Sequence, residues 1–504
     1  MRKNVKIPPA AVSCNTKTGI TVALLVLAGV ALRIGSSMNC FWMDEIWSYF
    51  TAMQASHPWE IITKIEVTNN HPLNTLFIYL MGDTKNWVWY RVPSIITGSL
   101  VPVLVWKAAS EYGLVEGLAA VGIATISYPL VLYSSEARGY APALFFALVS
   151  FFLLQDYWKS RDKTTLFLFW FSTILGLLSN LSFGLTYMAL IIWSMLHEAS
   201  KSRRFYDTVA ELLRCHTPPL IAMLYLVRSY IFITVKNGVA GARSPIFIAL
   251  SFKTLLAAML GTPQKGMILA AAVLVFMFLL TAGFIRLYKT DKLRAVFFLL
   301  AIFLPPVMGN LTSKLFYFRF ILVSFPFAFI VLGIGLSACF KHSLYSRTVA
   351  IVFLALFIYG NCTRIYGLIK IGRGDYLGAV MYMAENSKRK YITKPHGIII
   401  KGGTSHQTAK EDWITVASDH DFRNTMVLIF YSRYLPPGKN LVYVPHKQWL
   451  KEGSDWLLFH TQYTGVVPPP VYKLNNVQVY VLEKIFPYSG VSGWNWFLYR
   501  RINR

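Results

Sequence analysis

The sequence is poor in charged residues, and poorest in acidic ones. Only 14% of its 504 residues are Asp, Glu, Lys or Arg, against about 25% in an average soluble protein. This shortage, with 55% hydrophobic residues, argues against an ordinary soluble enzyme. Lys and Arg number 49 and Asp and Glu 23, which gives a net charge of +26. A basic excess can indicate nucleic-acid binding, but a nucleic-acid-binding protein of this size would need a mostly polar surface.

Cysteine is scarce, and the C-terminal part of the chain has none. The five cysteines are Cys14, Cys40, Cys215, Cys339 and Cys362. Because none follows residue 362, a disulfide framework in the C-terminal part is excluded, and no cysteine spacing predicts a zinc site. The chain also shows no internal repeat and no low-complexity tract.

Long apolar runs fill the first 366 residues. A membrane core of about 30 Å is crossed by about 20 apolar residues in a helix. Such runs lie near residues 20–36, 91–108, 115–132, 140–156, 165–179, 182–197, 217–235, 266–284, 294–309, 319–338 and 347–366. We therefore predict a polytopic α-helical membrane protein with about eleven transmembrane helices. The first run follows a basic N-terminus and is interpreted as a signal anchor, because no small-residue cleavage site follows it and further spans do.

Basic residues are concentrated in alternate loops of these predicted spans. If the N-terminus is cytoplasmic, the inside segments include the basic clusters at 159–163, 201–214 and 286–294. Short cytoplasmic loops carry an excess of Lys and Arg. The alternation therefore predicts a multi-pass protein of the inner or plasma membrane with a cytoplasmic N-terminus. An odd number of spans places the C-terminus on the outer, periplasmic or extracytoplasmic, face.

Residues 367–504 differ in composition from the part before them. Charged and polar residues return, and Pro-rich turns punctuate the segment. A helical stretch at 376–387 precedes short β-rich runs at 397–401, 426–431, 441–444, 456–460 and 477–482. We predict a transmembrane domain over 1–366, with a long outer loop at 37–90, and a small extracytoplasmic α/β domain over 367–504.

Two adjacent carboxylates, Asp44 and Glu45, follow the first predicted span in the aromatic-rich segment 41–49. Aromatic side chains are expected at the membrane–water boundary, but carboxylates there are costly unless they are solvated or paired. The pair is interpreted either as a hydrated helix end or as a general base that faces an outer cavity.

Polar residues interrupt three further outer segments. His71 lies in a loop with two asparagines, where Pro72 biases it away from helix, and it fits a structural role or a polar binding role. Glu136 and Arg138 lie in a very short loop between two spans. They form either a local ion pair or part of an anion site, since arginine binds phosphate bidentately. A second arginine, Arg319, lies at the outer end of the tenth predicted span.

Taken together, these motifs resemble those of the GT-C fold glycosyltransferases that use polyprenyl-phosphate sugars. That superfamily includes protein O-mannosyltransferases, the lipid A aminoarabinose transferase and the Rgt-type lipopolysaccharide galacturonosyltransferases. The likeness is carried by Asp44-Glu45, by His71-Pro72-Leu73, by Arg91-Val92-Pro93-Ser94 with Pro129 and 133–140, and by Arg319-Phe320 with Pro326. The chain departs from the family pattern at Leu73, where the family has a second proline, and at Phe320, where it has tyrosine.

The resemblance implies a catalytic role for the acidic pair in the first 366 residues. Asp44 would be the general base that deprotonates an acceptor hydroxyl for an inverting, single-displacement attack on the donor sugar. Glu45 would assist Asp44 or bind a divalent cation, although the sequence has no convincing metal cluster. The acceptor would be a glycan, a lipid or a protein of the cell envelope, such as lipopolysaccharide, and the reaction would take place on the outer face.

The resemblance also implies a binding site for the phosphate of a polyprenyl-phosphate-linked sugar donor. The residues that would form it are His71, Glu136, Arg138, Tyr140 and Arg319. Arg138 and Arg319, with a contribution from His71, would stabilise the leaving phosphate electrostatically, and Glu136 would orient Arg138. Besides donor and acceptor, membrane lipids are expected partners, and nucleic acid is not.

Two other classes of function fit parts of the sequence. A transporter or flippase of a lipid-linked or anionic substrate would carry charges at the bilayer midplane and weak internal repeats, and only Arg228 fits that pattern. A non-catalytic membrane scaffold for the outer domain would not need acidic and arginine motifs at matching depth.

Overall fold

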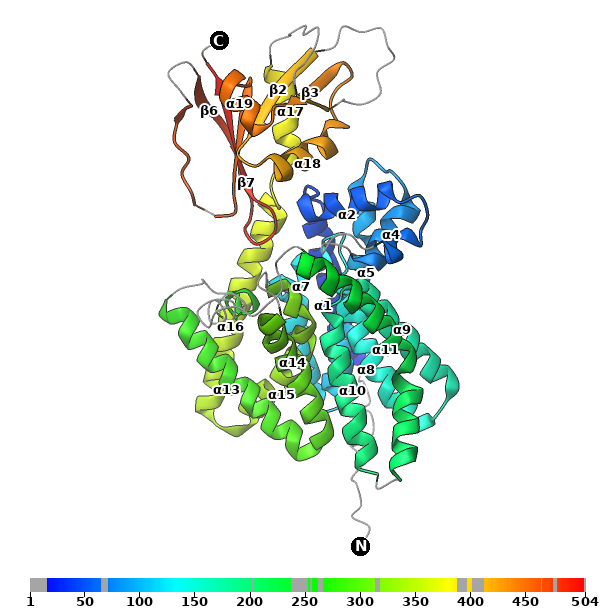
Figure 1. Ribbon diagram of the computed structural model, residues 1–504. Coiled ribbons are helices and arrows are strands. Elements are labelled where there is room, and N and C mark those ends of the chain that lie inside the picture. Colours follow the sequence, from blue (N-terminus) through cyan, green and yellow to red (C-terminus); the bar gives the residue numbers. More distant parts are fainter. Residues whose placement is uncertain are drawn as a thin grey trace. The chain divides into compact units, whose positions relative to one another are not determined.

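The computed structural model describes residues 16–64, 71–201, 204–236, 253, 256–261, 266–312, 318–387, 397–400, 412–463, 465–474 and 478–502. The chain forms two compact units (Figure 1). The first, here the helical unit, comprises Met1–Ser37 and Thr51–Ile365. The second, here the sheet unit, comprises Met38–Phe50 and Tyr366–Arg504. The sequence analysis kept residues 37–90 together in the transmembrane domain, whereas the contacts of the chain join Met38–Phe50 to the sheet unit.

The described residues of the helical unit form helices, two 3₁₀ turns and the segments that connect them. Its helices are α1 (Thr16–Ser37), α3 (Glu60–Thr63), α4 (Pro72–Met81), α5 (Val92–Ser110), α6 (Leu114–Ile126), α7 (Tyr128–Ser134), α8 (Tyr140–Ser160), α9 (Lys163–Ser179), α10 (Phe183–Ala199), α11 (Phe205–Lys236), α13 (Met267–Thr290), α14 (Lys292–Thr312) and α15 (Phe325–His342). The 3₁₀ turns are η1 (Trp87–Arg91) and η2 (Phe318–Ser324). Two helices, α2 (Met43–Gln54) and α16 (Leu344–Ile371), contain residues of both units.

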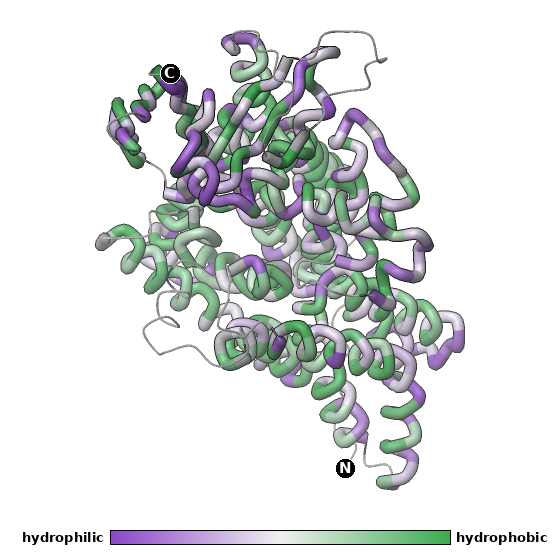
Figure 2. Tube along the Cα trace, turned by 45° about the horizontal axis from the view of Figure 1, so that its top comes forward, coloured by the Kyte–Doolittle hydropathy of each residue, from purple (hydrophilic) through white to green (hydrophobic). Residues whose placement is uncertain are grey.

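The predicted multi-pass helical architecture is confirmed. Seven of the described helical segments are long and apolar enough to cross a membrane, or eight if α6 and α7, which meet at a 56° bend, form one span. Hydrophobic residues predominate along these helices (Figure 2). The other three of the eleven predicted segments are also helical but lie outside this set. Helices α9 and α10 have 17 residues each, short of the about 20 that cross a bilayer core, and α11 contains two prolines and Arg228.

Helix α15 forms the centre of the helical unit. Nearly all its residues are buried, and glycines let neighbouring backbones approach it. A Cβ added at Gly335 would lie 1.9 Å from the carbonyl oxygen of Leu279 in α13, and one at Gly333 would lie 2.7 Å from that of Glu116 in α6. Small residues at helix contacts are typical of membrane bundles, because they let backbones pack closely.

The sheet unit contains a seven-stranded mixed sheet, which confirms the predicted small α/β fold. The strands are β1 (Ile398–Ile400), β2 (Asp412–Ser418), β3 (Lys439–Tyr443), β4 (Trp456–Thr461), β5 (Val471–Lys473), β6 (Val479–Phe486) and β7 (Asn495–Arg501), in the order β1-β3-β2-β4-β7-β6-β5. Strand β2 pairs in parallel with β3 and β4, and the other pairs are antiparallel. The helices of the unit are α17 (Tyr376–Asn386), α18 (Asp421–Ser432) and α19 (His446–Glu452).

One local prediction in this unit is wrong. The apolar run 426–431 was expected to be a β-strand, but it lies in helix α18. The side chain of His420 caps this helix, because its Nδ1 accepts a hydrogen bond from the backbone N–H of Arg423. The cap satisfies a free N–H of the first turn, and the buried residues of the helix, such as Val427, Leu428 and Tyr431, follow helical spacing.

Candidate active site

The loop that carries Glu136 and Arg138 is a tight turn between α7 and α8 in the helical unit. Both side chains are almost fully buried. The turn is held from two other helices: Ser94 of α5 donates from Oγ to the carbonyl of Arg138 at 2.8 Å, and Asn74 of α4 donates from Nδ2 to the carbonyl of Ala137 at 2.6 Å. The backbone that positions Glu136 and Arg138 is therefore fixed by side chains far away in sequence.

His71 and Gly139 meet at the backbone carbonyl of Ser179. The Nδ1 of His71 lies 2.9 Å from this oxygen. A Cβ added at Gly139 would lie 1.7 Å from the same oxygen, so any other residue at position 139 would push the end of α9 away. Since a carbonyl can only accept, Nδ1 carries the proton, and Nε2 of a neutral His71 is left as an acceptor.

His71 is held in its neutral form. Burial is the main reason that its pKa lies well below the ordinary value, and the positive charges of Arg138 and Arg319 add to the effect, although the hydrogen bond to Ser179 acts in the opposite direction. In neutral solution His71 therefore contributes no positive charge of the kind that the resemblance allowed for.

Two tyrosines, Tyr133 and Tyr140, belong to the same cluster of side chains as His71 and Arg138. The ring centroid of Tyr140 lies 5.0 Å from that of His71 and 4.8 Å from that of Tyr133. The guanidinium carbon of Arg138 lies 5.8 Å from the Tyr140 ring centroid, and Tyr133 interacts electrostatically with both Glu136 and Arg319. The structure thus brings together five of the residues singled out in the sequence, which are His71, Glu136, Arg138, Tyr140 and Arg319. They come from three separate segments of the chain, since Glu136, Arg138 and Tyr140 lie within five consecutive residues.

Several polar groups around this cluster are buried without a protein partner. Among the described residues, no hydrogen-bond partner exists for Tyr140 Oη, Asn74 Oδ1 or Asn180 Nδ2. Buried polar groups are otherwise almost always paired. Their number at one place fits a site that receives a polar ligand.

Tyr230 belongs to the cluster but was not singled out in the sequence. It lies on α11 and interacts electrostatically with Tyr140, Arg319 and Arg138. The sequence analysis had singled out Arg228 on the same helix, yet that side chain is exposed on the surface of the unit. No pattern in the sequence distinguishes Tyr230 from the many other aromatic residues of the spans.

The acidic pair lies in the sheet unit, on the first turn of α2. Glu45 is fully buried and accepts a hydrogen bond at Oε2 from the backbone N–H of Trp42, at 3.2 Å. A carboxylate that makes this contact caps the start of a helix, so Glu45 has a structural role. Asp44 is 9% exposed, and Ser48 donates from Oγ to its backbone carbonyl, an interaction that does not use the carboxylate.

Helix α18 holds the segment that carries the acidic pair. The hydroxyl of Tyr431 donates to the carbonyl of Phe41 at 2.7 Å, in a buried position. Arg433 donates from Nη1 to the hydroxyl of Tyr49 at 2.8 Å. The rings of Phe41 and Phe430 stack with centroids 5.4 Å apart. The C-terminal part of the chain therefore fixes the backbone on both sides of Asp44.

The residues present do not fit a metal site. In the part of the chain that the structure describes, no group of three or more His, Cys, Asp or Glu side chains could hold a metal ion. The divalent cation that the resemblance allowed for beside Glu45 therefore enters no step below.

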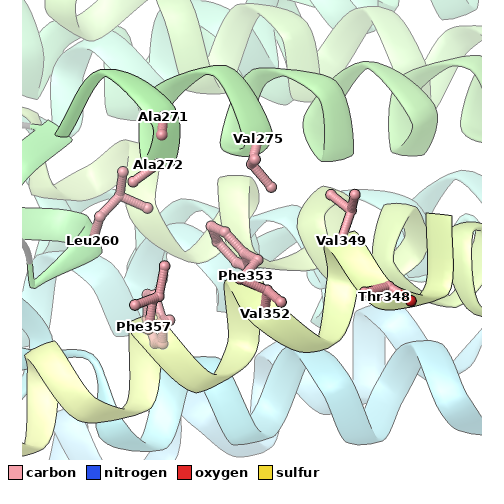
Figure 3. Close-up of a pocket in the computed structure, with 10 residues that line it drawn as sticks. Leu260, Ala271, Ala272, Val275, Thr348, Val349, Val352, Phe353 and Phe357 are labelled. Atoms are coloured by element: carbon pink, nitrogen blue, oxygen red, sulfur yellow. The ribbon is translucent and has the colours of Figure 1, made fainter. Parts of the chain in front are cut away.

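The helical unit also contains an apolar cavity of about 210 Å³. Figure 3 shows it between α13 and α16, with Val275 and Ala272 on one side and Phe353 and Val349 on the other. Its lining is almost wholly hydrocarbon, so it lacks the groups that acid–base chemistry or phosphate binding needs. The candidate site is therefore the polar cluster and not this cavity.

No protein-family model matches the chain, and no curated protein matches it in sequence. Among solved structures, it is similar to an Archaeoglobus fulgidus oligosaccharyltransferase tethered to an acceptor peptide, with a TM-score of 0.50 and 13% identity. That match covers 83% of this chain and 63% of the oligosaccharyltransferase. It is also similar to ArnT from Cupriavidus metallidurans bound to undecaprenyl phosphate, with a TM-score of 0.46, 11% identity, and coverage of 96% of this chain and 98% of ArnT.

These similarities concern the fold. Together with the apolar helices, the similarity to the oligosaccharyltransferase shows that the chain is a multi-pass membrane protein with the GT-C fold, as predicted from its motifs. The chain spans less than two thirds of the oligosaccharyltransferase.

Proposed function

We propose that this protein is an integral membrane glycosyltransferase that moves a sugar from a polyprenyl-phosphate donor to an acceptor hydroxyl, with inversion at the anomeric carbon. The observation that carries the proposal is the position of the buried Arg138 beside Tyr140, which packs against His71; the positive charges of Arg138 and Arg319 both lower the pKa of His71. The GT-C fold, which is shared with an oligosaccharyltransferase, supports the same class of reaction.

The two arginines suit the phosphate of such a donor. A guanidinium presents a planar pair of N–H donors that matches two phosphate oxygens. The second ionisation of a phosphate monoester has a pKa of about 6, so a lipid phosphate is stable once expelled and needs no strong general acid. Stabilisation of its developing negative charge is then the main electrostatic requirement, and Arg138 and Arg319 supply it.

Asp44 is the proposed general base. Its carboxylate takes the proton of the acceptor hydroxyl while that oxygen bonds to the anomeric carbon. The bond between the anomeric carbon and the phosphate oxygen breaks, and its electron pair leaves with the lipid phosphate. The base is assigned to Asp44 because the family resemblance implies it, and Glu45, which caps α2, is assigned the support of that backbone.

His71 and Tyr140 are proposed to position the donor. Neutral His71 offers a lone pair at Nε2, and Tyr140 offers a hydroxyl with no partner among the described residues. Both groups suit hydroxyls of a sugar or oxygens of a phosphate. Glu136, buried two residues before Arg138, is proposed to orient that arginine.

The proposed orientation places the N-terminus in the cytoplasm and the sheet unit outside an inner or plasma membrane. Ion pairs within the helical unit support a common side for the loops with the most basic residues. Glu116 forms ion pairs with Arg286 at 2.5 Å and with Lys341 at 3.3 Å, and Arg161 forms an ion pair with Glu198 at 3.2 Å. Each pair joins segments that the Lys/Arg pattern assigns to the cytoplasmic face.

The phosphate site can be tested by donor-lipid binding. Purified protein in nanodiscs is titrated with undecaprenyl phosphate, and the dissociation constant is compared for the wild type, Arg138→Gln and Arg319→Gln. Each variant should bind at least about tenfold more weakly, because a hydrogen bond between charged groups contributes about 1.5–3 kcal/mol.

Asp83→Asn, which changes an exposed carboxylate, serves as the control and should bind like the wild type. Arg319 is only partly buried, so its variant guards against a folding defect of the buried Arg138→Gln. Unchanged affinity in both arginine variants would remove the phosphate site from the proposal.

A further inference from the structure

The carboxyl ends of the parallel strands β2 and β4 in the sheet unit lie at a point where the chain connections diverge, and the proposed reaction does not use the residues there. From β2 the chain passes through α18 to β3 on one side, and from β3 through α19 to β4 on the other side of β2 (Figure 1). In open sheets, ligands bind outside the carboxyl ends of strands where the connections diverge in this way. Asp419 and His420 follow β2 at this point, and His460 lies near the end of β4.

Asp419 fixes the orientation and tautomer of His460. The Nδ1 of His460 lies 2.8 and 3.0 Å from the two carboxylate oxygens of Asp419, and the backbone N–H of His460 donates to the same carboxylate at 3.1 Å. Asn424 donates to it as well, at 3.2 Å. Because the proton sits on Nδ1, the Nε2 of a neutral His460 is an acceptor.

His460 in turn positions Arg423, on the first turn of α18. The Nη1 of Arg423 lies 3.3 Å from Nε2 of His460, and the backbone N–H of Arg423 donates to Nδ1 of His420 at 3.3 Å. The two imidazole rings are 5.7 Å apart. Since Nδ1 of His420 accepts, its Nε2 carries the proton. The guanidinium of Arg423 and the Nε2–H of His420 are therefore both hydrogen-bond donors at this end of the sheet.

The neighbouring acceptors are already engaged. The carboxylate of Asp419 accepts from His460 and Asn424, and that of Asp421 accepts from the hydroxyl of Tyr443 at 2.7 Å and the backbone N–H of His446 at 3.0 Å. The groups left at this end of the sheet are hydrogen-bond donors beside the positive end of a twelve-residue helix, which favours negative charge.

An independent donor lies beside His460. The ring of Trp494 stands edge-on to His460, with centroids 5.6 Å apart. Trp494 is 1% exposed, and its indole N–H has no hydrogen-bond partner among the described residues. A buried indole N–H is normally paired, and its position next to His460 points to an acceptor supplied by a ligand.

We propose that this side-chain cluster is an anion site, in which Arg423 and His420 bind a phosphate or carboxylate group and the Asp419–His460 pair positions Arg423. The proposal stands whether or not Asp44 is a catalytic base. The anion can come from a lipid headgroup or from a soluble molecule, and both carry the same chemistry.

The test uses the full-length protein in phosphatidylcholine nanodiscs, labelled with 5-fluorotryptophan. The ¹⁹F resonance of Trp494, assigned with Trp494→Phe, is followed during titration with inorganic phosphate. In a second arm, no inorganic phosphate is added, and phosphatidylglycerol is included in the nanodisc lipid instead. A saturable shift in the first arm alone supports a soluble anion, and a shift in the second arm supports a lipid headgroup.

Arg423→Gln should weaken the response at least about tenfold, because it removes a charged hydrogen bond, and Arg423→Lys should retain part of it. Lys447→Gln, which removes an exposed positive charge on the nearby α19, is the matched control and should respond like the wild type. An unchanged thermal midpoint shows that Arg423→Gln folds. The absence of a saturable shift in both arms, or an equal response in Arg423→Gln, overturns the proposal.

Discussion

At the scale of single residues, the candidate site depends on backbone atoms as much as on side chains. The sequence predicted His71, Glu136, Arg138, Tyr140 and Arg319 because charged and polar residues stand out among apolar spans. It could not predict that His71 and Gly139 both meet the carbonyl of Ser179. Every residue has such a carbonyl, so only the three-dimensional structure shows which one is used.

The environment of His71 predicts a dependence of stability on pH. The fold holds the pKa of His71 below its ordinary value, so below about pH 6.5 the unfolded chain binds a proton that the folded chain does not. The stabilisation is therefore complete above about pH 6.5 and decreases as the pH falls, by at most about 1.4 kcal/mol per pH unit. His71→Asn removes the titrating group.

The measurement is the free energy of unfolding in detergent at pH 7.5, 6.5 and 5.5 for both proteins. Wild type should lose more stability than His71→Asn between the upper and lower pH. Equal losses would show that His71 does not titrate in this way.

At the scale of elements, the helices of the membrane spans were predictable and the small sheet only in part. Twenty apolar residues in succession leave helix as the available span, whereas a short apolar run fits a strand or a helix equally well. The run 426–431 illustrates this ambiguity, because the cap from His420, outside the run, makes it part of α18. Strand β2 at Asp412–Ser418 contains three polar residues and was not predicted.

The grouping of Met38–Phe50 with the sheet unit was also beyond sequence reasoning. The contact between Tyr431 and Phe41 joins residues 390 positions apart, and no local pattern marks such pairs. In the proposed reaction, this contact means that helix α18 positions the segment that carries Asp44. Under this proposal, the sheet unit is part of the catalytic machinery.

Removing the Tyr431 hydroxyl tests this role of α18. Tyr431→Phe leaves the buried carbonyl of Phe41 without this donor, which should cost about 1–3 kcal/mol locally. Amide hydrogen exchange over residues 41–50 should accelerate about tenfold, with transfer activity reduced. Tyr463→Phe removes a hydroxyl from a side chain that is 77% exposed and should leave exchange in this segment unchanged. Unaltered exchange in Tyr431→Phe would show that α18 does not hold the segment.

At the scale of the whole molecule, the net charge of +26 has several separate uses. Basic residues pair with Glu111, Glu116, Glu198 and Glu211 at the ends of helices in the helical unit. Arg138 and Arg319 form the proposed phosphate site, and Arg423 forms the proposed anion site. Composition alone could not separate these uses, because each depends on which acidic side chain lies beside each basic one.

The central claim is that Asp44 is the base of a sugar transfer to an envelope acceptor. The most direct measurement is mass spectrometry of glycans and glycolipids from cells that lack the gene, complemented with the wild type, Asp44→Asn or Asp83→Asn. Asp44→Asn keeps the shape of the side chain but removes its proton-accepting charge, and general-base catalysis contributes about 10²–10⁴-fold. The wild type and Asp83→Asn should restore a glycan or glycolipid species that is heavier by one hexose or pentose, and Asp44→Asn should not. Asp44→Asn should nevertheless be expressed and should bind undecaprenyl phosphate. Full restoration by Asp44→Asn would contradict the account.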